Sequence, residues 1–231
     1  MVQVSRRTGF TGSALTRLLA RLTDIEVPEP KQAFADRLSQ WLGWTDAISL
    51  SAALNGGLAA ASSGARAAGN PEARECERVR TAMTNAIAED MHSASRDQTT
   101  DFAAYRRRYH ARQQAMETSI GPLRGRLRST LATRSPDMAR LAAVDVVMEQ
   151  VLGAQEHRLL ASIPAMLEKH FKRLGKADAI ANASADDEGA AEAEPGTWLA
   201  AFRKDMHDVL LAEMEVRFQP VEGLLEALRA R

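Results

Sequence analysis

The chain has 231 residues, of which 45% are apolar, 26% charged and only 5% aromatic, and its formal net charge is zero. Few aromatic residues alongside many leucines and alanines favour helix over sheet, because these side chains lose least on entering a helix. The zero net charge excludes a whole-molecule attraction to nucleic acid or anionic lipid, and the single cysteine, Cys76, excludes an internal disulfide and a cysteine-based zinc site.

Residues 1–55 form a predicted N-terminal helical subdomain. After Ser13, leucines recur at the i, i+3, i+4, i+7 spacing of one helical face, at Leu15, Leu18, Leu19 and Leu22. Arg17 and Arg21 interrupt these apolar residues, so the segment lacks the continuous apolar core of a secretion signal. We therefore expect a cytoplasmic protein, in agreement with its single cysteine.

A second helix is predicted from about residue 31, with one apolar stripe of Phe34, Leu38, Trp41 and Leu42. Gly43 lies where a left-handed C-terminal cap is expected, and Thr45 and Asp46 supply the N-cap and the first-turn carboxylate of a third helix. Trp44 lies in the turn between these two helices. We expect Trp44 to cover the junction as an apolar staple, and the alternative is a partner-docking role.

An uncharged run follows at 47–65 and is long enough to span a bilayer as a helix. Its glycines and serines disfavour partition into lipid, so we predict no membrane insertion. Residues 56–69, with the sequence GGLAAASSGARAAG, are typical of a flexible linker. Their glycine spacing fits neither a phosphate-binding loop nor a dinucleotide-binding fingerprint.

Residues 70–175 predict a bundle of long helices that carries a basic stripe. The segment contains three helix-start signals, which are Asn70 before Pro71, Asp101, and Ser135 before Pro136. The first helix carries apolar residues along one side, at Cys76, Val79, Met83, Ile87 and Met91. The middle helix repeats this pattern at Phe102, Tyr105, Tyr109, Met116, Ile120, Leu123, Leu127 and Leu131.

Two of these helices are expected to bend. Gly121 and Pro122 should kink or break the middle helix. The apolar pattern after Pro136 continues to Leu174, so we predict one long helix that bends near Pro164 and ends at Gly175. If continuous, this helix would be about 60 Å long, which exceeds what a compact molecule of this size offers.

The chain ends with a linker and a helix. Residues 176–196 are rich in alanine and acidic residues and predict an acidic disordered linker. Residues 197–231 predict a C-terminal helix that is capped by Thr197 and interrupted by Pro220. Because no segment alternates apolar and polar residues, we predict an all-α fold, built as an elongated helical bundle or as helical hairpins with coiled-coil character.

The most distinctive charged feature is the basic stripe. Residues 99–135 contain eight arginines against Asp101 and Glu117, an excess of six positive charges. The stripe could bind nucleic acid, an acidic protein surface or the acidic segment 176–196 of the same chain, or it could be a solvated helix face. The predicted partner-binding residues are Trp44, Arg106, Arg107, Arg108, Arg112, Arg124 and Arg128.

No catalytic, cofactor-binding or metal site is predicted. The five histidines lie far apart in the sequence and form no short-spaced metal-binding pair. Cys76 falls on the apolar face of its predicted helix, where a thiol is usually an inert small hydrophobe. We therefore expect a non-enzymatic protein with no cofactor and no metal.

The segments TGSALTRLLARL and FADRLSQWLGWTDAISLSAAL resemble a proteobacterial family that is catalogued as a domain of unknown function. The resemblance covers the whole chain, and the block WLGWTD at 41–46 is its most specific part. Members of the family have no assigned catalytic residue, so the resemblance implies no site. Their genes tend to lie beside genes for coiled-coil membrane proteins and for peptidoglycan-binding proteins of the outer-membrane-protein-A type. This implies a cytoplasmic accessory of an envelope-spanning assembly.

These observations together predict a helical adaptor or scaffold. The apolar stripes are long relative to the chain, which favours self-association into a homo-oligomer and docking onto a helical or coiled-coil protein. The basic stripe would then select the partner. The alternative is a nucleic-acid-binding helical protein that uses the arginines between residues 105 and 134.

Overall fold

The computed structural model describes residues 13–24, 32, 34–55, 71–97, 100–188 and 197–230. These residues contain eight helices and no strand, so the prediction of an all-α fold is confirmed. The helices are α1 (Ala14–Thr23), α2 (Phe34–Trp41), α3 (Trp44–Asn55), α4 (Pro71–Asp97), α5 (Phe102–Ala132), α6 (Pro136–Leu160), α7 (Ile163–Glu188) and α8 (Thr197–Arg229). The predicted linker at 56–69 lies outside the described residues.

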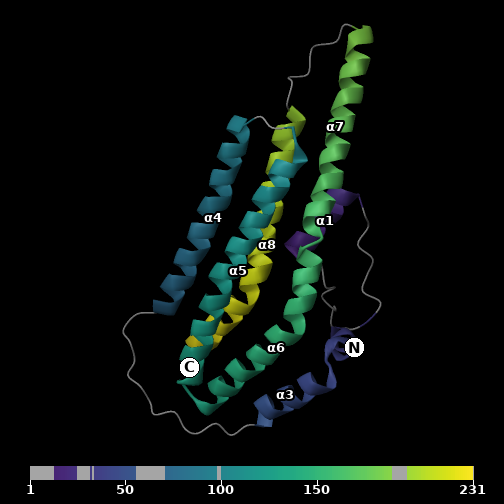
Figure 1. Ribbon diagram of the computed structural model, residues 1–231. Helices are drawn as coiled ribbons and strands as arrows, with labels where there is room; N and C mark the ends of the chain where they lie inside the picture. Colours follow the sequence, from purple (N-terminus) through teal and green to yellow (C-terminus); the bar gives the residue numbers. More distant parts are fainter. Residues whose placement is uncertain are drawn as a thin grey trace, which may run out of the picture.

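The long helices lie side by side as an elongated bundle (Figure 1). α5 contacts α4, α6 and α8, and α8 also contacts α4 and α7. α6 and α7 follow each other along one side of the bundle (Figure 1). α1 packs across α7 and α8, and α3 packs against α6. The coiled-coil character of the packing stays a prediction.

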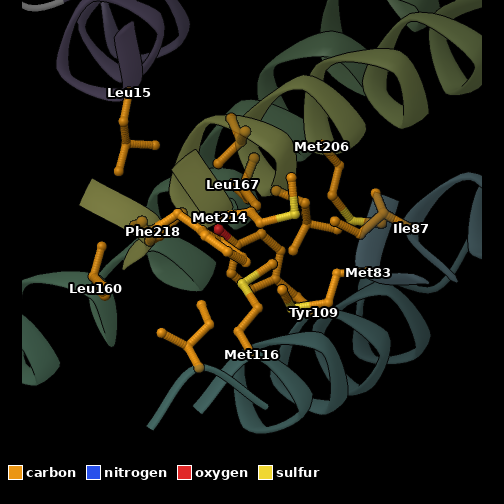
Figure 2. Close-up of a cluster of buried hydrophobic side chains, with 14 of the residues drawn as sticks. Leu15, Met83, Ile87, Tyr109, Met116, Leu160, Leu167, Met206, Met214 and Phe218 are labelled. Carbon is orange, nitrogen blue, oxygen red and sulfur yellow. The ribbon is translucent and has the colours of Figure 1, made fainter. Parts of the chain in front are cut away.

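The core follows the apolar stripe of α5. All eight apolar positions predicted for this helix are buried, from Phe102 to Leu131. Figure 2 shows Tyr109 and Met116 of α5 among side chains of α4 and α8, including Ile87 and Met214. Each such side chain contributes about 1.5–3 kcal/mol to the stability of the fold by leaving water. Burial of the stripe therefore explains why α5 runs through the centre of the bundle.

Aromatic rings fill the end of the core at which α5 and α8 begin. Phe202 of α8 packs edge-on against Phe102, Tyr105 and Phe171, with ring centroids 6.1, 5.2 and 4.9 Å away. Trp198 meets Phe171 at 5.0 Å. Edge-to-face pairs at these distances stabilise beyond the area that they bury. The cluster therefore joins α5, α7 and α8.

Three of the predicted helix starts are confirmed by their caps. The side chain of Ser13 accepts a hydrogen bond from the backbone N–H of Thr16 before α1. Asp101 accepts one from Ala103 at 2.9 Å before α5, and Ser135 accepts one from Met138 at 3.2 Å before α6. Caps of this kind satisfy the free N–H groups of the first turn and contribute about 1 kcal/mol each.

Neither proline breaks its helix, although the sequence predicted a kink or break at Pro122 and an interruption at Pro220. α5 runs without interruption through Gly121 and Pro122, and α8 runs through Pro220. Proline removes one backbone hydrogen bond from a helix. However, buried side chains lie on both sides of each proline, as Ile120 and Leu123 do around Pro122 in α5. Tertiary packing therefore outweighs the local cost of the proline.

The prediction that one long helix ends at Gly175 is wrong. The segment consists of α6 and α7, which are separated at Ala161 and Ser162, close to the bend predicted at Pro164. α7 then passes Gly175 and continues to Glu188, because the alanine-rich sequence favours helix. Its far end projects beyond the other helices (Figure 1). The segment predicted as a disordered linker is thus helical over 176–188, and its remainder lies outside the described residues.

The corner between α2 and α3 is built differently from the prediction. Gly43 does not take the left-handed backbone conformation, and Thr45 lies inside α3 rather than before it. Instead, the backbone N–H of Gly43 donates a hydrogen bond to the carboxylate of Asp46, at 2.9 Å. This is the carboxylate half of a capping box with Gly43 at the N-cap position, so the first-turn carboxylate predicted at Asp46 is confirmed, whereas Thr45 is not the N-cap.

Candidate functional site

An apolar groove of about 590 Å³ runs between α1 and the pair formed by α6 and α7, with α8 at its base. A cavity of this volume lies in the range of protein binding sites. One wall residue, Leu159, is 63% exposed, so its side chain is accessible at the edge of the groove. The apolar lining comes from five helices and consists of Leu15, Leu19, Ala20, Trp41, Leu152, Leu159, Leu160, Ile163, Met166, Val216 and Pro220.

A smaller charged cleft of about 320 Å³ adjoins the apolar groove, and Leu152, Glu156 and Pro220 line both. Glu156 has neither a hydrogen bond nor an ion pair within the part of the chain that the structure describes. Burial raises the pKa of the Glu156 carboxyl, while Arg217 and Arg124 oppose this rise. The other ionisable residues that line the cleft are Glu117, Arg124, Glu149, His157 and Arg217.

A buried carboxylate, Glu213, binds Arg217, one of the residues that line the charged cleft. Glu213 is 0% exposed and accepts a hydrogen bond from the hydroxyl of Tyr109 at 2.6 Å. Nε2 of Gln113 and the guanidinium of Arg217 also donate to it, at 3.1 and 2.8 Å. Gln113 donates in addition to the backbone carbonyl of Leu160, at the end of α6. This network therefore holds α5, α8 and the junction of α6 with α7 in place beside the groove.

The outer wall of the groove, α1, is held by a second polar cluster. Nη2 of Arg173 donates to the carbonyl of Leu22 at 2.7 Å and to Nδ1 of His170 at 3.1 Å. Since Nδ1 of His170 accepts, its Nε2 carries the proton that is donated to Asp205, at 2.7 Å. Arg21 of α1 also approaches Asp205, at 3.8 Å. The cluster thus joins the C-terminal end of α1 to α7 and α8.

Trp44, a predicted partner-binding residue, does not form the expected staple. Its side chain is 82% exposed, so it covers no junction between α2 and α3. Asp46, Leu50 and Ala53 are the less exposed residues of α3, and Trp44 and Ile48 lie on the opposite side of this helix. The physical reason is that α3 packs on α6 through one narrow face, which leaves most of its apolar side chains in contact with water.

The arginines of the basic stripe are largely paired within the bundle. Arg106 contacts Glu168 of α7 and lies 5.4 Å from the ring of Phe102. Arg112 holds Asp90 of α4 with two hydrogen bonds of 2.5 and 3.0 Å. Arg107 is exposed, and Arg108 is half-buried. These pairs join α5 to its neighbours, so part of the stripe serves the fold.

Arg124 and Arg128 share two carboxylates of α6. Arg124 donates to both oxygens of Asp145, at 2.6 and 2.9 Å, and Arg128 donates to Asp145 and Glu149, both at 2.6 Å. Burial raises the pKa of the Asp145 carboxyl, but the hydrogen bonds from the two arginines outweigh burial and hold this pKa below its ordinary value. In the described residues these arginines therefore pair with α6 and not with the acidic segment 176–188.

This lowered pKa predicts an acid-sensitive contribution to stability. Because the folded pKa of Asp145 lies below the ordinary value of 3.8, its pairing stabilises the fold fully above that value and is lost as pH falls through the folded pKa. Asp145→Asn should lower the free energy of unfolding at pH 7 by about 1–3 kcal/mol. Urea unfolding at pH 7, 4 and 3 should show a smaller loss in acid for this variant than for the wild type, and equal losses would contradict the assignment.

Comparison with known proteins identifies the family. A family model described as "Protein of unknown function (DUF3348)" matches residues 1–230. The chain belongs to the DUF3348 family. This confirms the resemblance to a domain-of-unknown-function family, whereas the proteobacterial origin and the WLGWTD block as its mark stay predictions. No curated protein and no solved structure matches the chain. The function of this DUF3348 chain is therefore argued from its own geometry.

The described part of this DUF3348 chain contains no group of three histidine, cysteine or acidic side chains suited to a metal ion. Cys76 is buried in α4, and burial, with a smaller effect of Glu75, raises the pKa of its thiol. A thiol with a raised pKa stays protonated and is a poor nucleophile. Among the described helices, none combines the length and the apolar content needed to cross a membrane.

Sequence reasoning missed Glu156 and Glu213, which matter most at this site of the DUF3348 chain. A signal for Glu213 was present, because it continues the apolar stripe of α8 three positions after Leu210. A carboxylate on such a stripe needs buried partners. Glu156 likewise lies on an apolar stripe, four residues after Leu152 and three before Leu159. The sequence does not show, however, which helices meet these carboxylates.

Proposed function

We propose that this DUF3348 chain is a non-enzymatic cytoplasmic adaptor that binds a helical or coiled-coil segment of a protein partner in the apolar groove. The observation that carries the proposal is the groove itself, an apolar trough of about 590 Å³. Leu159 at its edge remains 63% exposed. Amphipathic helices bind proteins by laying their apolar side chains into grooves of this kind.

Rigid walls support this mode of binding. The inner walls belong to α6, α7 and α8, and the Glu213 network joins α8, through α5, to the end of α6. The outer wall, α1, is held by Arg173 and Asp205. A groove whose walls are already in place loses little conformational entropy when it binds, which favours affinity.

Self-association is the second part of the proposal. None of the exposed residues of α3 is charged, and they include Trp44, Ile48 and Leu54. Two copies can therefore bring this face together without repulsion between like charges. An exposed apolar face of this kind on a surface helix is typical of a protein interface.

A place beside an envelope-spanning assembly is the third part of the proposal, and it rests on the family resemblance alone.

Nucleic-acid binding through the basic stripe is the rival function. Four arginines of the stripe, Arg106, Arg112, Arg124 and Arg128, already pair with carboxylates of the bundle. Each must leave its carboxylate before it can bind a phosphate, so the structure favours nucleic-acid binding less than protein binding. A steep loss of polyanion binding with rising salt would support the rival.

The groove is tested by two aspartate substitutions on the same helix. Leu159→Asp places a charge in the groove, whereas Leu141→Asp changes another exposed leucine of α6 that does not line it. We expect recovery of the partner from native cells, measured by quantitative mass spectrometry, to fall at least tenfold for Leu159→Asp and to stay near wild type for Leu141→Asp. Equal recovery with both variants, at equal melting temperature, would contradict the proposal.

A further inference from the structure

The apolar groove and the charged cleft form one continuous surface. Leu152, Glu156 and Pro220 line both of them. On α6, Leu152, Glu156 and Leu159 follow one another at intervals of four and three residues, so they share one face of the helix. Glu156, the one ionisable residue among the described residues that line the groove, is thus placed between two leucines on its wall.

The cations around Glu156 are already in use. Arg217 pairs with Glu213 and Glu117, at 2.8 and 3.4 Å. Arg124 and Arg128 pair with Asp145 and Glu149, as described above. The arrangement therefore sets five carboxyl groups, those of Glu117, Asp145, Glu149, Glu156 and Glu213, against the three arginines Arg124, Arg128 and Arg217.

Glu156 is the one carboxyl of these five that has no hydrogen-bonded partner in the described residues. Burial disfavours its charged form, as the direction of its pKa shows. A carboxylate in such a position is stabilised when a cation arrives from outside. The surface therefore presents, at a defined place in its wall, a carboxyl group that no side chain of the described residues pairs with.

Lysine and arginine are suited to pair with that carboxyl group from within a groove. Their long aliphatic stems can lie along apolar side chains such as Leu152 and Leu159 while the charged group reaches a carboxylate. An acidic side chain at the same place would add a further negative charge, and a purely apolar one would bury Glu156 without a partner.

We propose that the groove selects an amphipathic helix that carries a lysine or arginine on its apolar stripe, and that Glu156 binds this cation. The inference rests on the proposed function and deepens it, because it states the chemistry of the partner. It also separates this partner from acidic or uncharged amphipathic helices, which the apolar lining alone would accept.

A displayed library of helical peptides tests the inference. Each peptide carries a fixed leucine stripe at i, i+3, i+4 and i+7, and positions on and beside the stripe vary among lysine, alanine and glutamate. We expect selection on the wild-type full-length chain to enrich lysine peptides about tenfold over their glutamate counterparts. Glu156→Gln should abolish the preference, and Glu156→Lys should reverse it.

Two controls show whether a loss of the lysine preference is specific to Glu156 and whether the Glu156→Gln variant folds. Glu89→Gln changes an exposed carboxyl of α4 outside the groove and should leave the lysine preference intact. Glu156→Gln should fold with a melting temperature at least equal to that of the wild type, because it removes a half-buried charge.

Any of three results would overturn the inference. If leucine-stripe peptides are enriched with no charge preference, or keep the lysine preference on Glu156→Gln, Glu156 does not bind the cation, and the proposed adaptor function stands. If no leucine-stripe peptide is enriched over scrambled sequences, the adaptor function fails together with the inference.

Discussion

Replacing Glu213 by alanine is expected to lower the free energy of unfolding by about 3–5 kcal/mol, the range for a buried ion pair that loses one partner. Glu213 is 0% exposed, and its carboxylate accepts hydrogen bonds from Tyr109, Gln113 and Arg217. Without it, the guanidinium of Arg217 keeps only the longer contact to Glu117, at 3.4 Å. The loss would be a large fraction of the 5–15 kcal/mol that stabilises a typical domain.

Two control variants distinguish the network from its parts. Glu213→Gln keeps an acceptor for Tyr109 but removes the charge that faces Arg217, so it should destabilise the fold less than alanine does. Glu117→Ala removes the exposed partner of the same arginine and should lower the free energy of unfolding by less than about 1 kcal/mol. Urea unfolding followed by circular dichroism measures all three variants. A loss for Glu213→Ala no larger than that for Glu117→Ala would show that the network does not stabilise the fold.

Replacing Phe202 by alanine is expected to lower the free energy of unfolding by a similar amount, about 3–5 kcal/mol. Phe202 is 0% exposed, and its ring packs edge-on against the rings of Phe102, Tyr105 and Phe171. The substitution removes these ring contacts and leaves a cavity among three helices. The cost is large because helices that are already packed against one another can close such a cavity only in part.

Thermal and urea unfolding provide the measurement for Phe202. Phe202→Leu fills most of the cavity and should recover more than half of the loss, although it lacks the edge-to-face contacts. Ile180→Ala is the matched surface control, because Ile180 is an exposed hydrophobic residue on α7. It should change the free energy of unfolding by less than about 0.5 kcal/mol. The cavity argument fails if Phe202→Ala is tolerated as well as Ile180→Ala.

The periodic features of the chain were predictable without the structure. The stripe of α5 from Phe102 to Leu131 is buried at every predicted position. The caps at Asp101 and Ser135 are in place. Such features depend on residues within one or two turns of each other, so local spacing is enough to recognise them.

Errors arose where contacts between distant segments outweigh local preference. Pro122 and Pro220 are tolerated within helices whose flanking residues are buried. Gly175 does not end α7, and an added Cβ there would lie 3.4 Å from the ring of Trp198. Gly175 therefore lies in close contact with the Trp198 ring of α8 and not at a helix end.

The candidate site, too, was predictable only in its local features. The sequence drew attention to Arg106, Arg112, Arg124 and Arg128 as a charged stripe, but a positive charge is free to bind a partner only when no carboxylate already holds it. Their carboxylate partners lie on three other helices, between 17 and 62 residues away along the chain. The division of the chain into domains, the oligomeric state and the partner-binding role of these residues stay predictions.

By itself, the sequence determined that this protein is all-α, where most of its long helices begin, and which of their faces are apolar. It did so because burial periodicity and helix caps are local properties of the chain. Only the tertiary structure decided that Tyr109, Gln113 and Arg217 meet at Glu213, and that Glu156 lies between an apolar groove and a charged cleft. The physical reason is that a carboxylate's partners are set by which helices pack together, and that packing brings residues about 100 positions apart into contact.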